Sequence, residues 1–116
     1  MDKKEKQAKK SVISKAIDLA NGRYKDEEID TLYDLVKNSS EYNGKSKTHK
    51  NSFKGFSSEG RYTGTEETTY TIRADDNKVK IEERYQYNDS DGDSRSYDKE
   101  HTKGRDILSL LHKIKK

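Results

Sequence analysis

Two runs of alternating apolar and polar residues flank a short turn near residue 76, and they constrain the fold more than any other feature. Tyr70, Ile72 and Ala74 alternate with polar residues before the turn, and Val79 and Ile81 do so after it. Alternation with a period of two is typical of a strand with one buried face. A two-residue turn at 76–77 predicts an antiparallel hairpin with these opposed pairs: Ala74 and Val79, Ile72 and Ile81, Thr69 and Arg84.

Three segments have the apolar spacing of helices instead. Residues 3–20 carry an apolar stripe in their second half, and Asn21-Gly22 is a good stop signal. Residues 26–38 begin with three carboxylates, which favour a helix N-terminus, so the two segments predict an αα-hairpin. Residues 105–115 carry the most apolar stripe in the chain and predict an amphipathic C-terminal helix.

The rest of the chain is more polar. Asp91-Gly92 predicts a second hairpin turn that leads into a strand around 95–100. Residues 38–60 are rich in Ser, Asn, Gly and Lys and predict either a long loop or a loop with one edge strand. We therefore expect one small α+β domain over 1–116. It combines the αα-hairpin, an antiparallel β-meander of three or four strands and a C-terminal helix packed on one sheet face, with 1–10 and 39–52 loosely ordered.

The two faces of the predicted sheet differ in polarity. The helices are expected to cover the apolar face. Glu83 falls on that face, which must then be open to water near it. The other face is expected to be solvated and carries Thr69, Thr71, Arg73, Glu82, Arg84 and Gln86.

The apolar core is small. Ile, Leu, Val and Phe make up 18 of the 116 residues, so the eight tyrosines are expected to supply much of the buried area. The chain has no cysteine, and therefore no disulfide and no thiolate metal site. No apolar run resembles a signal peptide or a membrane span, so we expect no membrane contact and a cytoplasmic location.

Charge is arranged in alternating blocks. Residues 1–25 contain 8 basic residues (Lys and Arg) and 3 acidic residues (Asp and Glu). The numbers of basic and acidic residues are 1 and 6 in 26–42, 5 and 1 in 43–64, 6 and 11 in 65–102, and 5 and 1 in 103–116. Fields add within such blocks and steer charged partners. The pattern indicates a molecule that meets a partner through a charged surface.

The acidic block predicts a protein interface. Tyrosine is enriched at protein interfaces, and carboxylates complement the basic grooves of nucleic-acid enzymes. The alternative is a solvated rim of the sheet. The candidate interface residues are Glu66, Glu67, Glu82, Glu83, Tyr85, Tyr87, Asp89, Asp91, Asp93, Tyr97 and Asp98.

The lysine-rich ends are candidate nucleic-acid contacts, although terminal lysines also serve solubility alone. A helix-turn-helix in the first two helices conflicts with the negative charge of residues 26–42, and base stacking on the sheet conflicts with its acidic surroundings. The candidate phosphate contacts are Lys3, Lys4, Lys6, Lys9, Lys10, Lys113, Lys115 and Lys116.

No motif points to catalysis, a cofactor or a small-molecule substrate. The run 89–93 resembles a calcium loop, but Tyr87 occupies the position of the first carboxylate ligand, so a solvated turn is the simpler interpretation. Asp98, Glu100 and His101 form a weak candidate for a metal site of a small hydrolase or nuclease. We therefore expect neither catalytic residues nor a bound metal.

In format, the chain resembles the small anti-CRISPR inhibitors that phages and mobile elements use to evade host defence. The resemblance lies in its brevity, the lack of Cys and Pro, the lack of a catalytic motif, the compact αβ layout and the uneven charge. It implies a non-enzymatic inhibitor that docks on a CRISPR effector nuclease or a similar enzyme, with or without its guide RNA or DNA, and blocks it. The alternative is a nucleic-acid-binding accessory or regulatory protein that uses the lysine-rich ends.

Overall fold

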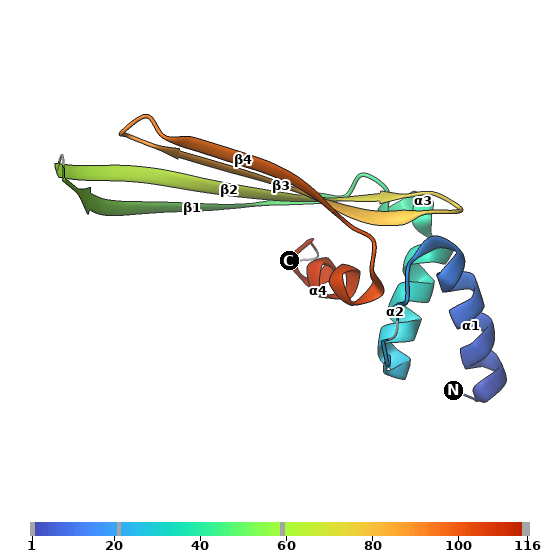
Figure 1. Ribbon diagram of the computed structural model, residues 1–116. Helices are drawn as coiled ribbons and strands as arrows, with labels where there is room; N and C mark the ends of the chain where they lie inside the picture. Colours follow the sequence, from blue (N-terminus) through green and yellow to red (C-terminus); the bar gives the residue numbers. More distant parts are fainter. Residues whose placement is uncertain (1, 21, 59, 115–116) are drawn as a thin grey trace.

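A computed structural model describes residues 2–20, 22–58 and 60–114 and confirms the predicted α+β fold (Figure 1). The sheet is antiparallel with the order β1-β2-β3-β4. The helices lie on one side of it (Figure 1). In chain order the elements are α1 (Lys3–Ala16), α2 (Asp26–Lys37), α3 (Ser39–Tyr42), β1 (Ser46–Ser57), β2 (Gly60–Ala74), β3 (Val79–Asp89), β4 (Ser94–His101) and α4 (Gly104–Ile114).

The predicted hairpin register is confirmed. Ala74 lies opposite Val79, and Ile72 lies opposite Ile81. Asp75 closes the turn, because its carboxylate accepts the backbone N–H groups of the residues two and three positions later, at 2.8 Å each. The predicted strand around 95–100 is also confirmed and is β4.

The core lies at the turn end of this hairpin. Ile72, Val79 and Ile81 are almost fully buried there. They belong to one cluster with buried side chains of the helices: Ile13, Ile17, Ile29, Leu32, Leu35, Val36, Ile107, Leu110, Leu111 and Ile114. Burying apolar area at about 25 cal/mol per Å² is the main stabilising contribution, so this end of the molecule anchors the fold.

Helix α1 begins at Lys3, as the sequence predicted, but it ends at Ala16 rather than at residue 20. Asp2 caps its N-terminus by accepting the Glu5 N–H at 2.9 Å, and Lys9 pairs with Asp30 of α2 at 2.6 Å. Residues 3–10, expected to be loosely ordered, are therefore helical. The helix stops at Ala16 because Asp18 turns to pair with the segment before α4, donating to Thr102 O at 3.1 Å.

For residues 38–60 the sequence predicted either a long loop or a loop with one edge strand, and the structure contains the edge strand. Residues 39–42 form a short helix, and β1 then pairs with β2 over its whole length. Two glycines make room for rings on the facing strand. A Cβ at Gly64 would lie 2.3 Å from the Phe53 ring, and one at Gly55 would lie 2.6 Å from the Tyr62 ring. Close packing of aromatic rings over glycine stabilises this pair of strands. Within 39–52, the interval expected to be loosely ordered, residues 39–42 are helical and 46–52 pair with β2.

The sheet is much longer than its helical cover. The molecule measures 64 × 25 × 22 Å, and the strands project beyond the helices as a twisted ribbon (Figure 1). We name this projection the arm and define it as residues 50–57, 60–67 and 85–97. No described helix lies against it, so its side chains depend on one another for packing.

We predict that Ile81→Ala lowers the free energy of unfolding by about 2–5 kcal/mol, because this side chain is fully buried between the sheet and the helices. Urea unfolding followed by circular dichroism measures the change. Gln86→Ala, at an exposed site of the arm, serves as the control and should stay within about 0.5 kcal/mol of the wild type. Equal effects of the two substitutions would contradict a core confined to the helical end.

Candidate functional site

The strand register sorts the side chains of the arm onto two faces. Successive residues of a strand point to opposite sides, so residues in register with Ile72 and Ile81 share the side on which the helices pack. This side carries five aromatic rings beyond the helices, and we name it the aromatic face. Its rings are Phe53, Tyr62, Tyr85, Tyr87 and Tyr97.

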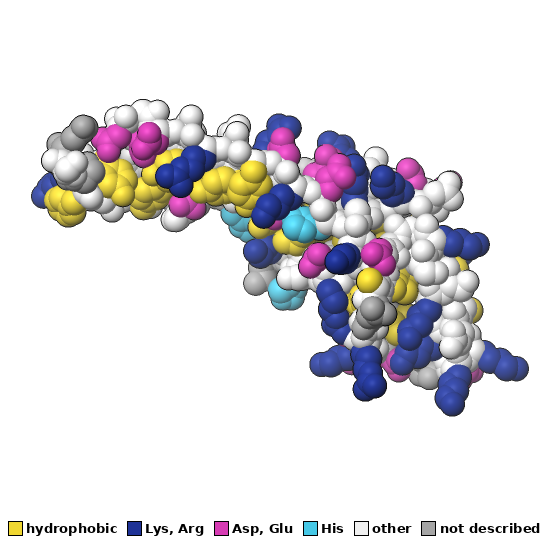
Figure 2. Space-filling model, viewed as in Figure 1, with side chains coloured by type: hydrophobic (Ala, Val, Ile, Leu, Met, Phe, Trp, Pro, Cys, Tyr) yellow, Lys and Arg dark blue, Asp and Glu magenta, His cyan; other side chains and the backbone are white. Residues whose placement is uncertain are grey.

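The rings form two groups along the aromatic face. Phe53 stacks on Tyr87 with centroids 5.7 Å apart and meets Tyr62 edge-on at 6.3 Å. Tyr85 stacks on Tyr97 at 4.9 Å. Hydrophobic side chains accordingly run along the lower side of the arm in Figure 2. Four of the five rings are half-buried, and Tyr97 is 39% exposed.

Two cations lie over these rings. The Arg95 guanidinium is 5.5 Å from the Tyr87 centroid, and the Lys99 ammonium is 4.8 Å from that of Tyr97. Such contacts contribute about 0.5–1 kcal/mol at exposed sites. The aromatic face is therefore a surface of rings bordered by positive charge.

Glu83 joins the aromatic face to the core. Its carboxylate accepts the Tyr97 hydroxyl at 2.5 Å, and the His101 Nε2 lies 3.0 Å from its other oxygen. The Glu83 side chain is only 12% exposed, so the prediction that the apolar face is open to water near this residue is wrong. Two hydrogen-bonding side chains, rather than solvent, offset the cost of placing this charge on the apolar face.

These contacts shift two pKa values. Burial acts to raise the pKa of Glu83, but the hydrogen bonds from Tyr97 and His101 outweigh it and hold the pKa below its ordinary value of 4.5. The same hydrogen bond raises the pKa of Tyr97 to about 12, because ionising the phenol would place two negative charges together. Glu83 is therefore charged at neutral pH and positions the Tyr97 ring.

The opposite face of the sheet carries a ladder of ion pairs, and we name it the charged face. Arg73 lies 2.6 Å from Glu82, and Arg84 lies 3.1 Å from Asp98. Two further pairs, Lys80 with Glu100 at 2.7 Å and Lys50 with Glu67 at 3.9 Å, complete it. Exposed pairs contribute little stability each, and Lys54 and Arg61 lie on the same face in addition to them.

The predicted acidic, tyrosine-bearing surface is therefore divided by the structure. Glu67, Glu82 and Asp98 lie on the charged face, paired with bases, whereas the tyrosines lie on the aromatic face with Glu66 and Glu83. Neighbours in a strand alternate between faces, and basic residues stand beside the carboxylates across the strands. The sequence block is acidic, but it does not produce one acidic face.

The remaining carboxylates of the candidate interface belong to the β3–β4 turn. Asp89 accepts the N–H groups of Asp91 and Asp93 at 2.9 and 3.0 Å and the Tyr87 hydroxyl at 2.8 Å. Burial acts to raise the pKa of Asp89, and these hydrogen bonds lower it by more. The first carboxylate of the calcium-like run thus organises a turn.

The weak metal candidate at the end of β4 is not assembled. Asp98 pairs with Arg84, Glu100 with Lys80, and His101 with Glu83 on the other face. Among the residues that the structure describes, no three His, Asp or Glu side chains gather closely enough to hold a metal ion.

The lysine-rich ends do not form one patch. Lys6 and Lys9 pair with carboxylates of α2, and Lys113 lies over the Tyr70 ring at 5.4 Å. The N-terminal end of α1 and the end of α4 lie apart (Figure 1). Lys3, Lys4 and Lys10 lie on α1, and Lys115 and Lys116 lie outside the described residues.

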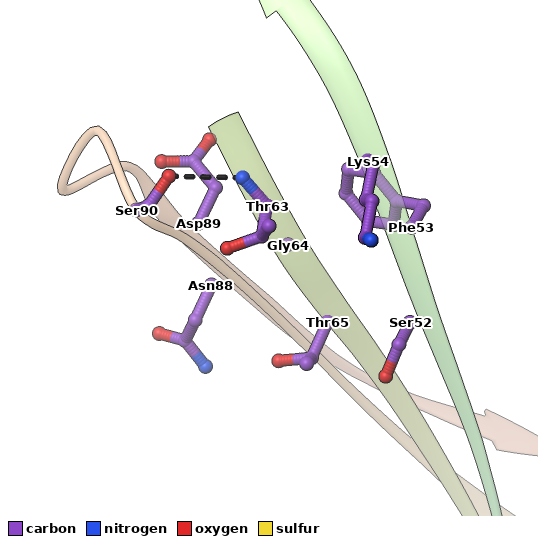
Figure 3. A pocket seen from close by; sticks show the side chains of 9 residues that line it. All are labelled: Ser52, Phe53, Lys54, Thr63, Gly64, Thr65, Asn88, Asp89 and Ser90. Carbon is purple, nitrogen blue, oxygen red and sulfur yellow. Dashed lines mark hydrogen bonds between the residues drawn. The ribbon is translucent and has the colours of Figure 1, made fainter. Parts of the chain in front are cut away.

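A shallow hollow of about 580 Å³ lies near the tip of the arm (Figure 3). Hydroxyl and amide groups of β1, β2 and β3 line it, among them Ser52, Thr65 and Asn88. The Thr63 N–H donates to the Ser90 hydroxyl at 2.9 Å beside it. The lining of the hollow combines these polar groups with the Phe53 ring and with Gly64, so it is continuous with the aromatic face.

The chain was compared with protein-family models, with curated proteins and with solved structures, and none of the three comparisons found a match. None of the described helices is both long and apolar enough to cross a membrane. What the arm can bind therefore follows from its own geometry and chemistry.

The sequence interpretation named three of the five rings and missed Phe53 and Tyr62. The signal that identifies them is their pairing with glycine, since Phe53 faces Gly64 and Tyr62 faces Gly55 across the strands. That signal becomes visible only once 46–57 is recognised as a strand.

We predict that Glu83→Gln flattens the acid dependence of stability. A carboxylate with a lowered pKa stabilises the fold above the ordinary value of 4.5, and this stabilisation is lost as the pH falls through the lowered pKa. Urea unfolding at about pH 7 and about pH 3 measures it: the variant should be less stable than the wild type at the higher pH, and the gap should shrink at the lower.

The matched control is Glu66→Gln, which removes the same charge from the same face. A wild type and a Glu83→Gln variant that differ by a constant amount at every pH would contradict the role assigned to the Glu83 carboxylate.

Proposed function

We propose that this protein acts by binding rather than by catalysis, and that it docks on another protein through the aromatic face of the arm. The observation that carries this proposal is the row of five rings that extends beyond the helical cover. Tyr, Phe and Arg are the side chains enriched in protein interfaces. A few such anchors usually supply most of the binding energy.

The ring contacts favour a protein over nucleobases. Tyr85 stacks on Tyr97 and the Lys99 ammonium lies over the same ring, with both groups within 5 Å of the ring centre. Tyr87 likewise has Phe53 stacked on it and the Arg95 guanidinium over its ring. Base stacking needs a free ring face, whereas protein interfaces use ring edges and hydroxyl groups as well.

We further propose that the partner is a nucleic-acid-handling enzyme of host defence, of the CRISPR effector type that the resemblance in format implies. The slender shape of the arm supports this proposal, because a ribbon of this kind fits a groove that would otherwise hold nucleic acid. Binding there would block substrate entry or a domain movement.

We predict that the protein inhibits target cleavage by guide-loaded CRISPR effector nucleases at near-stoichiometric amounts. The double variant Phe53→Ala, Tyr87→Ala should need at least about tenfold more protein for half inhibition, since truncating an anchor typically costs more than 1 kcal/mol. Titration of purified protein into a panel of cleavage reactions measures this.

The control is Gln86→Ala, which lies at the same level of the arm on the charged face and should inhibit as the wild type does. A double variant that inhibits as well as the wild type would remove the aromatic face from the proposal. Failure to inhibit any effector of the panel would remove the proposed class of partner.

The nucleic-acid alternative makes a different prediction. Binding of labelled duplex DNA that falls steeply with salt, and falls again in Lys3→Gln, Lys4→Gln, Lys10→Gln, would replace the proposal. These three lysines project from α1 and lie far from the arm (Figure 1).

A further inference from the structure

The outer edge of β1 is the longest open edge of the sheet. β1 is the first strand in the sheet order and pairs with β2 along all twelve of its residues. At about 3.3 Å per residue it presents roughly 40 Å of edge. An edge of this kind is a template for another extended chain, which proteins either block or use.

Hydrogen bonding fixes which groups of β1 face outward. The Ile72 N–H donates to Lys45 O at 2.8 Å, so the odd-numbered residues from 45 onward bond to β2. In an antiparallel ladder the residues between them point their N–H and C=O groups away from the partner strand. The outward residues are Ser46, Thr48, Lys50, Ser52, Lys54 and Phe56.

The charged side chains of β1 itself have one sign. Residues 46–57 contain Lys47, Lys50 and Lys54 and no carboxylate; all three lysines are exposed, and Lys50 lies 3.9 Å from Glu67 of β2. The other edge strand, β4, is different. It carries two bases and two acids over 94–101, and both acids pair with bases of β3. The two edge strands therefore differ in charge, and they would favour different partners.

We propose that the edge of β1 accepts an extended acidic peptide segment of a partner as a fifth strand of the sheet. Each outward residue presents an N–H and a C=O, and the backbone of another strand can pair with both; a phosphate chain only accepts hydrogen bonds and would leave each outward C=O to water. Carboxylates on one face of the incoming strand complement Lys50 and Lys54, which share the charged face.

The same charge argues against a second copy of this strand. Pairing β1 with the β1 strand of another copy would join two strands that carry lysines and no carboxylate, so no opposite charges would pair across them. Because this edge is a different surface from the aromatic face, the inference goes beyond the proposed function and stands or falls separately.

The experiment uses the purified full-length protein and a capped synthetic peptide of twelve residues that alternates Glu and Thr. Amide hydrogen exchange followed by NMR reports the pairing. We expect protection of the N–H groups of Thr48, Lys50 and Ser52 when the peptide is added. A peptide with Lys in place of every Glu should bind at least tenfold more weakly.

Two matched proline variants test the role of the edge. Ser52→Pro removes an outward N–H and should weaken peptide binding at least tenfold, while proline is tolerated at such an edge position. Ser96→Pro is the control on β4, where the Asp89–Asp93 hydrogen bond of 3.0 Å places the Ser96 N–H outward by the same alternation. It should bind the peptide as the wild type does. Circular dichroism checks that both variants fold.

A charge-reversed double variant tests the same edge without introducing a proline. Lys50→Glu, Lys54→Glu should prefer the lysine peptide to the glutamate peptide. Equal binding of the two peptides, an unchanged Ser52→Pro variant, or protection of these amides by oligothymidylate but not by the acidic peptide would each overturn the inference.

The outcome is separable from that of the inhibition assay. The peptide measurement uses this protein alone, so its failure leaves the aromatic-face proposal intact. Failure of the inhibition assay likewise leaves the peptide result unaffected.

Discussion

The pairing of β2 with β3 determines which side chains share a face along the whole sheet. A slip of one residue would move every side chain of one strand to the opposite face. The observed register places Ile72 beside Ile81 in the core and continues without interruption to Gly64 and Asp89 near the tip. The buried end and the exposed arm are thus two ends of one ladder, and the core sets the orientation of the arm.

From this constraint follows the division of chemistry between the two faces. Rings and the shielded Glu83 lie on the helical side, and paired acids and bases lie on the other. The ion pairs of the charged face contribute little to the free energy of unfolding, but they place a base beside each of its paired carboxylates.

The hairpin register and the helices could be predicted from sequence because each depends on contacts between neighbours in the chain. Ile72 and Ile81 are brought together by a turn of two residues, and the helical stripes need no distant partner. β1 could be predicted only as an alternative, because its order comes from β2. Its polar sequence has no apolar alternation, and Phe53 is ordered by a glycine eleven residues away.

The candidate site was predicted in part for the same reason. Tyr85, Tyr87 and Tyr97 share the aromatic face, but Glu67, Glu82 and Asp98 lie on the opposite face. Summing the charge along 65–102 treats residues that are adjacent in sequence as one patch. In a strand, however, adjacent side chains point to opposite faces of the sheet. The position of Arg84 beside Asp98 depends on β4, which a sum over the block cannot represent.

Glycine beneath the rings of the arm has a consequence for how a partner is met. With no side chain at Gly64, Phe53 rests directly on the backbone and is held against Tyr87 without help from a helix. The surface is therefore preorganised in the free molecule, and little side-chain entropy is left to lose when a complex forms. In the complex that we propose, the encounter need only align this rigid surface with the partner, and the lifetime of the complex would depend on how well the partner's surface follows the twist of the ribbon.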